Sequence, residues 1–224
     1  MLKAIVYDLD GTLIDSRADL AASVNAALVA MGLPELPLST LIQFVGGGAE
    51  MLVRRSLAAA RGAGERAEAL DDNLVVNALP HWHAAYAARL LDETKLYPGL
   101  AELVGMQTIP QAVLTNKPGG YSRRILEGLG VAEAFRFVIG GDEAPRKPDP
   151  RGLLSLCEKM NARPGETLLV GDSHFDVDAG KAAGVPVCAV SWGFDSREAL
   201  ERKQPEFLVD SAGELGALLE RLAH

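Results

Sequence analysis

Two carboxylates stand two positions apart near the start of the chain, in the stretch MLKAIVYDLDGTLIDS. An apolar run, Leu2 to Tyr7, ends at Asp8, and Asp10, Gly11 and Thr12 follow it. Like charges this close repel each other, and removal from water penalises each of them. A bound cation together with a negatively charged substrate would explain the arrangement.

Further polar residues follow other apolar runs of the chain. The run from Gln111 ends in Thr115, Asn116 and Lys117, and the run from Thr167 ends in Asp172, with Asp176 shortly after it. Lys147 lies in GGDEAPRKPDP, which follows a third run. In an open parallel sheet the carboxyl ends of the strands share one edge, so these side chains are expected to converge there.

Such a set of groups suits phosphoryl transfer. Carboxylates at this density favour a hard cation, and oxygen ligands select Mg²⁺. One carboxylate can act as a nucleophile and form an aspartyl phosphate. A metal ion, an ammonium and hydroxyl or amide donors can neutralise the phosphoryl oxygens.

Strands that alternate with helices are expected to position these residues. Apolar runs predict strands at 2–7, 111–116, 135–141, 167–172, 185–192 and 207–210, and helical spacing predicts helices at 122–129, 150–160, 179–183 and from 213 onward. This alternation favours a parallel sheet covered on both faces.

A helical segment interrupts the alternation just after the first strand. Helices are predicted at 16–31, 39–45, 49–60 and 65–91, and the last is expected to break or kink at Pro80. The core is therefore expected to comprise residues 1–15 and 96–224, with a helical domain at 16–95 between them.

Composition restricts the partners of the chain. It has 224 residues and a formal net charge of -8, and it lacks a long basic tract, which argues against nucleic acid. Cys157 and Cys188 lie in apolar segments, so a disulfide framework is not expected. Neither a signal-peptide pattern nor an apolar run of membrane-spanning length is present, so we expect a cytoplasmic protein without membrane contact. A monomer and a homodimer both remain open.

DLDGT, TN, the lysine before PDP, and GDSHFD resemble motifs one to four of the haloacid dehalogenase superfamily, in that order. The resemblance covers essentially the whole chain. It implies an α/β fold, a Rossmann-like parallel sheet core with an inserted α-helical C1 cap domain. DLDGTLIDS, ADLAASVNAAL, FVGGGAEMLVRRSL, YPG and TNKP are most similar to the phosphoglycolate phosphatases of that superfamily.

The resemblance assigns roles to individual residues. Asp8 resembles the nucleophile, which is also a ligand of Mg²⁺. Asp10 resembles the general acid and base, and its backbone carbonyl would also ligate Mg²⁺. Thr115 and Lys147 would hold the phosphoryl oxygens, with Asn116 positioning its neighbours. The remaining roles are a metal ligand at Asp172, a supporting contact at Asp176 and phosphate-facing backbone amides near Gly11 and Thr12.

An acid at position 10 argues against dehalogenation, because an alkoxide is a poor leaving group without a proton and a phosphatase needs that acid. No lysine lies between Ser16 and Thr94, which excludes the Schiff-base chemistry of the similar phosphonoacetaldehyde hydrolases. The Arg-bearing recognition stretch of the similar sugar phosphomutases is not found in the insert.

Substrate contacts are predicted in the insert as well. The glycines of FVGGGAE precede a helix, so amides near Gly47 and Gly48 could bind a substrate anion, although a simple connecting turn explains them equally well. Arg54 is a candidate contact of the non-phosphate end of the substrate.

A Mg²⁺-dependent phosphatase acting on a small phosphorylated metabolite, with 2-phosphoglycolate as the favoured substrate, fits these features. Pyrophosphate, a sugar phosphate or an amino-sugar phosphate are alternative substrates, because pocket shape decides specificity. A non-catalytic binding protein on this fold is the alternative of another class. For Asp176, a role in the site and a role as a helix-start charge both remain open.

Overall fold

The apolar run before Asp8 forms a fully buried strand, β1 (Ala4–Tyr7), at the centre of a sheet. The computed structural model describes residues 1–62, 67 and 70–223. Within these residues the sheet has six strands in the order β5-β4-β1-β6-β7-β8, and all the pairings are parallel. The other strands are β4 (Gln111–Leu114), β5 (Phe137–Ile139), β6 (Thr167–Gly171), β7 (Val187–Val190) and β8 (Phe207–Val209). The predicted parallel sheet is confirmed.

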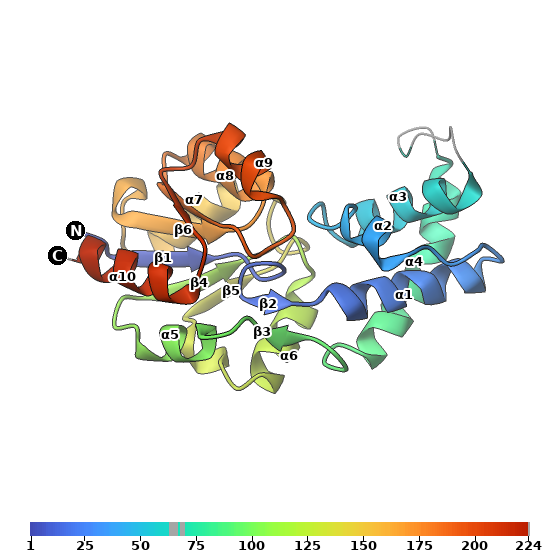
Figure 1. Ribbon diagram of the computed structural model, residues 1–224, viewed down its shortest axis with the longest axis horizontal. Coiled ribbons are helices and arrows are strands. Elements are labelled where there is room, and N and C mark those ends of the chain that lie inside the picture. The colour runs from blue at the N-terminus through green and yellow to red at the C-terminus, as the bar shows by residue number, and fades with distance from the viewer. Residues whose placement is uncertain (63–66, 68–69, 224) are drawn as a thin grey trace. The chain divides into compact units, whose positions relative to one another are not determined.

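Helices cover both faces of this sheet, as Figure 1 shows. On one face lie α7 (Arg151–Lys159), α8 (His174–Ala183) and α9 (Arg197–Lys203). On the other lie α5 (Leu100–Met106), α6 (Gly119–Gly128) and α10 (Ala212–Ala223). Apolar side chains of α7 and α8, such as Leu153, Leu156 and Val177, pack with Val6 and Leu169 of the strands in one buried cluster. Burial of this apolar surface fixes the sheet on which the site is built.

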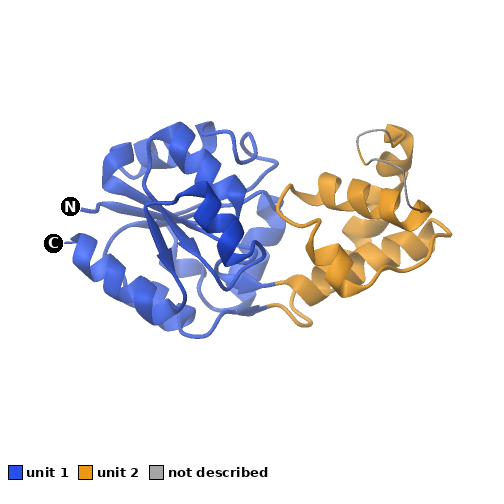
Figure 2. Ribbon diagram, turned by 45° about the horizontal axis from the view of Figure 1, so that its top comes forward, with its two compact units in different colours: residues 1–15, 95–224 blue, residues 16–94 orange. Residues whose placement is uncertain are grey.

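The chain divides into two compact units (Figure 2). Unit 1 comprises Met1–Asp15 and Lys95–His224, and unit 2 comprises Ser16–Thr94. Lys95, which the sequence-based division assigned to the insert, lies in unit 1, where it pairs with Asp15. That pair belongs to a short antiparallel ladder of β2 (Ile14–Asp15) and β3 (Lys95–Leu96).

Unit 2 is helical in its described residues. Its helices are α1 (Arg17–Ala30), α2 (Leu38–Ile42), α3 (Ala49–Arg61) and α4 (Asp72–Ala88). The first part of the predicted helix 65–91 falls largely outside the described residues. Of the break or kink predicted at Pro80, the break is wrong, because α4 continues through this residue. The kink stays a prediction. Pro80 lies on the exposed side of α4, so water can reach the carbonyl group that lacks its usual partner.

A buried carboxylate joins the beginning and the end of unit 2. Asp19 in the first turn of α1 accepts hydrogen bonds from Thr94 N at 2.8 Å, from Thr94 Oγ1 at 2.7 Å and from Glu93 N at 3.1 Å. Asp19 is 2% exposed, so these donors replace the water that the carboxylate loses.

Two sequence-based boundaries differ from the structure near the strand ends. Helix α8 begins at His174, although periodicity predicted a start at Ala179, because Ser173 and Asp176 form a capping box that starts it earlier. Helix α6 begins at Gly119, before the predicted Ser122. No helix among the described residues is both long and apolar enough to span a membrane.

Candidate active site

Three neighbouring strands deliver the polar residues of the site. In the sheet, β1 lies between β4 and β6. Asp8 directly follows β1, Thr115 directly follows β4, and Asp172 directly follows β6. The sheet therefore brings the chain segments around Asp8, Thr115 and Asp172, which are far apart in the sequence, to one edge.

Lys147 binds two of the carboxylates. Its Nζ lies 2.8 Å from Asp8 Oδ1, in a close ion pair, and 2.6 Å from Asp176 Oδ1. Burial raises the pKa of Asp8 to about 7; Lys147 opposes this rise and Asp176 adds to it. Burial disfavours the charge on Lys147, but the Asp176 and Asp8 carboxylates outweigh it and raise the pKa of the ammonium. The ammonium therefore remains charged next to the candidate nucleophile.

Asn116 fixes the loop that carries Lys147. Its side chain donates to Lys147 O at 3.0 Å and accepts from Lys147 N at 2.8 Å. This pairing links the loop after β4 to the loop after β5. Asn116 positions its neighbour, and Thr115 lies beside it with its Oγ1 accepting from Lys117 N at 3.2 Å.

Asp172 is fully buried and held by two other loops. Its Oδ1 accepts from Thr12 Oγ1 at 2.8 Å, and its Oδ2 accepts from Phe194 N at 2.7 Å. Burial, together with the Asp8 and Asp176 carboxylates, raises the pKa of Asp172 well above its ordinary value. A cation beside it would favour the ionised form.

Glycines leave room for the Asp172 side chain. A Cβ atom on Gly11, whose φ is +85°, would lie 2.1 Å from Asp172 Oδ2. A Cβ atom on Gly193 would lie 2.2 Å from Asp172 Cβ. Both positions therefore need a residue without a side chain. Gly193 belongs to a loop that the sequence analysis did not connect with the site.

Asp176 combines the two roles that its sequence position left open. Its Oδ2 accepts from Ser173 N at 3.0 Å and from Ser173 Oγ at 2.5 Å, which caps α8. Its Oδ1 accepts from Lys147. Asp176 therefore connects the start of α8 to Lys147.

Asp10 binds a second ammonium, that of Lys117, which the sequence analysis expected at the same edge of the sheet but to which it assigned no role. Lys117 Nζ lies 2.7 Å from Asp10 Oδ1 and 2.7 Å from Asp10 Oδ2. The only sequence signal for this contact is a lysine directly after Thr115 and Asn116.

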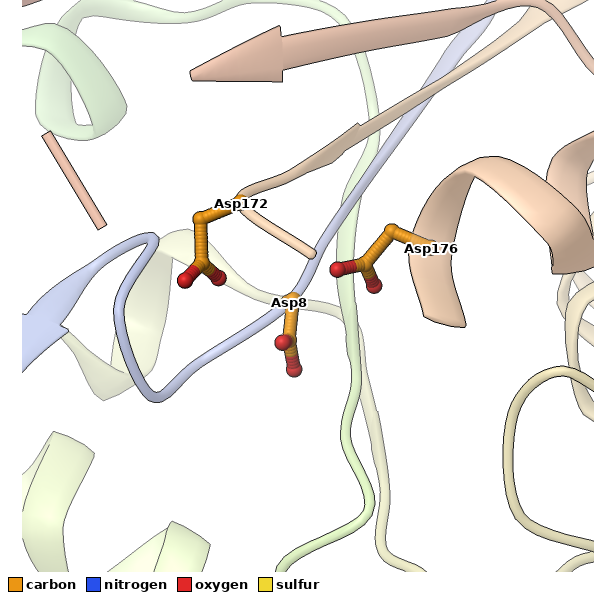
Figure 3. A group of neighbouring side chains, drawn as sticks. All are labelled: Asp8, Asp172 and Asp176. Atoms are coloured by element: carbon orange, nitrogen blue, oxygen red, sulfur yellow. The ribbon is translucent and has the colours of Figure 1, made fainter. Parts of the chain in front are cut away.

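The carboxylates fit a hard divalent cation. Asp8, Asp172 and Asp176 each offer one oxygen atom within 4.8 Å of the others, and all three residues are buried (Figure 3). Oxygen-only ligands of this kind are typical of Mg²⁺ sites. The predicted contribution of Asp10 to a metal is its backbone carbonyl, which this grouping of side chains does not include.

The residues predicted to contact the substrate in the insert lie in unit 2. Gly48 is the residue before α3 and has a φ of +88°, which favours glycine. Gly47 directly precedes it. The Arg54 guanidinium forms an ion pair with Asp72 at 2.6 Å and with Glu50 at 3.5 Å. A ligand of Arg54 would compete with these carboxylates.

A family model described as haloacid dehalogenase-like hydrolase matches residues 5–190. A protein named phosphoglycolate phosphatase from Pseudomonas putida is 38% identical over 221 residues, covering 97% of this chain and 78% of the relative. One of the same name from Rhodospirillum rubrum is 42% identical over 202 residues, covering 88% of this chain and 83% of the relative.

Solved structures of similar fold are likewise described as phosphatases. A crystal structure described as a predicted phosphoglycolate phosphatase from Haemophilus somnus 129PT has a TM-score of 0.90 and 30% identity, with 97% of this chain and 98% of that chain covered. A predicted phosphatase from Clostridium acetobutylicum, at 24% identity and a TM-score of 0.85, covers 99% of both chains and shares the fold.

Proposed function

Because the chain belongs to the haloacid dehalogenase-like hydrolases and is a phosphoric monoester hydrolase, we propose that it hydrolyses 2-phosphoglycolate with Mg²⁺ through an aspartyl phosphate on Asp8. The carrying observation is the ion pair of Asp8 with Lys147 at the cluster that Asp8 forms with Asp172 and Asp176. Relatives that bear the name of this activity support the choice of substrate.

In the first step, a carboxylate oxygen of Asp8 attacks phosphorus. The bond from phosphorus to the ester oxygen breaks, and its electron pair moves to that oxygen. Asp10, two residues further along the same loop, gives its proton to the departing oxygen and so avoids a free alkoxide. Lys147 and the Thr115 hydroxyl are proposed to donate to the phosphoryl oxygens, where negative charge must be balanced.

In the second step, water attacks the phosphorus atom of the aspartyl phosphate. Asp10 is now ionised, because it has lost its proton, and it takes a proton from the attacking water. The bond between phosphorus and Asp8 breaks, and inorganic phosphate leaves. Asp10 is thereby protonated again and ready for the next ester.

A divalent cation held by Asp8, Asp172 and the Asp10 carbonyl would supply positive charge next to the phosphoryl group. The proposed role of Asp176 is to support Lys147 rather than to replace these ligands. Thr12 and Phe194 N hold the Asp172 carboxylate from the side. The orientation of Asp172 therefore depends on residues that need not touch the substrate.

The test is inorganic phosphate release from 2-phosphoglycolate, pyrophosphate, several sugar phosphates and an amino-sugar phosphate, with Mg²⁺ and with excess chelator. Metal-dependent preference for 2-phosphoglycolate is the expected result. Preference for another compound would reject the substrate but retain the chemistry. No release from any compound would reject the proposed reaction.

A further inference from the structure

Each lysine of the site serves a different aspartate of the first motif. Lys147 contacts Asp8, and Lys117 contacts Asp10 through both carboxylate oxygens. Lys117 has 3% of its side chain exposed and Asp10 has 14%. Solvent therefore hardly reaches Lys117, and Asp10 is the more accessible member of the pair.

Its contribution to stability alone explains this largely buried pair poorly. Removing an ammonium and a carboxylate from water costs free energy, and their attraction often only balances this cost. An apolar pair of similar volume would be as stable or more stable. The pair instead holds a carboxylate that is only two residues from Asp8 in the chain, where the orientation of a carboxylate has chemical consequences.

The Lys117 backbone is fixed on both sides. Lys117 N donates to Thr115 Oγ1 at 3.2 Å, and Lys117 O accepts from Gly141 N at 2.9 Å. Pro118 follows and restricts the backbone before α6 begins at Gly119. The ammonium is therefore presented to Asp10 from a defined position.

The contact with Lys117 is compatible with proton transfer by Asp10. A carboxylate offers about four lone-pair sites, and one ammonium between its two oxygens uses one on each. The ammonium therefore does not occupy the outer site of either oxygen, where a proton can bind. A fixed carboxylate plane aims that proton in a fixed direction, and catalysis is sensitive to displacements of about 1 Å.

The formal charges of the site also give Lys117 a role beyond stability. The carboxylates of Asp8, Asp10, Asp172 and Asp176 face two ammonium groups, which leaves two negative charges among these six side chains. A divalent cation would cancel them. Without Lys117 the set would carry three negative charges, one more than a divalent cation cancels, whenever Asp10 is ionised, as it is after the first step.

We propose that Lys117 is a positioning residue, which holds the Asp10 carboxylate in the orientation for proton transfer to the departing oxygen. This inference rests on the proposed function, since it takes Asp10 as the general acid. The transferred proton passes only from Asp10 to the ester oxygen.

The test compares two leaving groups, with kcat/KM as the readout because it reports the steps up to formation of the aspartyl phosphate. The alkoxide of 2-phosphoglycolate needs a proton to leave, whereas p-nitrophenolate does not. In Lys117→Met we expect kcat/KM to fall by about 100-fold for 2-phosphoglycolate and by less than about 3-fold for p-nitrophenyl phosphate. Lys117→Arg, which keeps the charge, should recover part of the loss.

Lys147→Met is the matched control, because the same change at the other ammonium should lower kcat/KM for both esters alike. An equal loss for both esters in Lys117→Met, or no loss, would overturn the inference. If Lys117→Met does not fold, Lys117→Gln takes its place, with the same expected difference between the esters.

The outcomes also separate this inference from the proposed function. If the wild-type protein hydrolyses p-nitrophenyl phosphate but not 2-phosphoglycolate, the substrate is wrong, and the alkyl ester that the protein does accept decides the role of Lys117. Wild-type inactivity on every ester would overturn the proposed function and this inference together.

Discussion

The Asn116 side chain and the Lys147 peptide group hydrogen-bond to each other in both directions, at 3.0 and 2.8 Å. One amide thus closes a pair of hydrogen bonds across two loops that start at different strands. Both residues are buried, so water cannot easily replace a lost partner. The position of the Lys147 ammonium depends on this pair.

Asn116→Ala should therefore displace the Lys147 ammonium, although the Lys147 side chain itself is unchanged. We expect kcat/KM to fall by about 10-fold to 100-fold, and the free energy of unfolding to fall by about 1–3 kcal/mol because two backbone groups lose their partners. Steady-state kinetics and denaturant unfolding measure the two effects. Asn77→Ala, the same change at an exposed position of α4, is the control and should alter neither quantity appreciably. Unchanged kcat/KM in Asn116→Ala would contradict the dependence.

Asp8→Asn should abolish turnover, since an amide cannot attack phosphorus, and should leave no covalent phosphate on the protein. Asp10→Asn should also abolish turnover, because the departing oxygen receives no proton. Phosphate release and intact-protein mass measure both results. A mass increase by one phosphoryl group in Asp10→Asn would show that the first step proceeds without the Asp10 proton and that Asp10 is required in the second step. Retained turnover in Asp8→Asn would refute the nucleophile.

Magnesium should stabilise the protein more at pH 8 than at pH 5. Folding raises the pKa of the Asp8 carboxyl from 3.8 to about 7. The contribution of Asp8 to folding stability is therefore fully present below pH 3.8, and it is lost as the pH rises to about 7. Burial shifts the pKa of Asp172 in the same direction. Cation binding must displace these protons, so it is weaker at low pH.

The measurement is the melting temperature with excess chelator and with Mg²⁺ at each pH. At pH 8 we expect an increase of about 5–10 °C when Mg²⁺ is present at about 100 times its Kd. Asp172→Asn is the control, and it should lose most of the increase. An equal increase at both pH values would contradict displacement of protons from these carboxylates.

Gly193→Ala should weaken magnesium binding although Gly193 carries no side chain. The added Cβ atom would lie 2.2 Å from Asp172 Cβ, so the carboxylate must shift. We expect Mg²⁺ affinity to fall by about 10-fold to 100-fold, as for residues that orient a metal ligand. Titration of activity with Mg²⁺ measures it.

Gly105→Ala is the matched control, because an added Cβ atom there meets no described atom within 4 Å. It should leave the Mg²⁺ dependence unchanged and, in an exposed helix, slightly raise stability. If Gly193→Ala bound Mg²⁺ as tightly as Gly105→Ala, the close approach of Gly193 to Asp172 would not matter for Mg²⁺ binding.

The parallel sheet could be predicted because its signals are local. Each strand is a short apolar run that ends in polar residues, and Asp8, Thr115 and Asp172 follow such runs directly. A shared edge of the sheet then brings their chain segments together without further information. The α/β fold with a parallel sheet is accordingly confirmed.

Other features depend on contacts between distant residues. Lys117 and Asp10 are 107 positions apart, and although a shared sheet edge was expected for both, it does not predict that their side chains pair. Phe194 N reaches Asp172 from a loop that has no motif of its own. The early start of α8 was visible in Ser173 and Asp176, but apolar periodicity alone missed it. The predicted substrate contacts Gly47, Gly48 and Arg54 stay predictions.

The way in which the chain leaves and re-enters unit 1 has a consequence for replacing the insert with a foreign segment. The chain leaves unit 1 at Asp15 and returns at Lys95, and these two residues pair with each other in the β2–β3 ladder. On the other side, Asp19 binds Glu93 and Thr94. The first and last residues of the insert are thus held close together, as are the ends of a loop that joins two adjacent strands. Any segment whose ends lie equally close could be spliced between these residues, so a chimaeric protein with a foreign insert should retain the sheet.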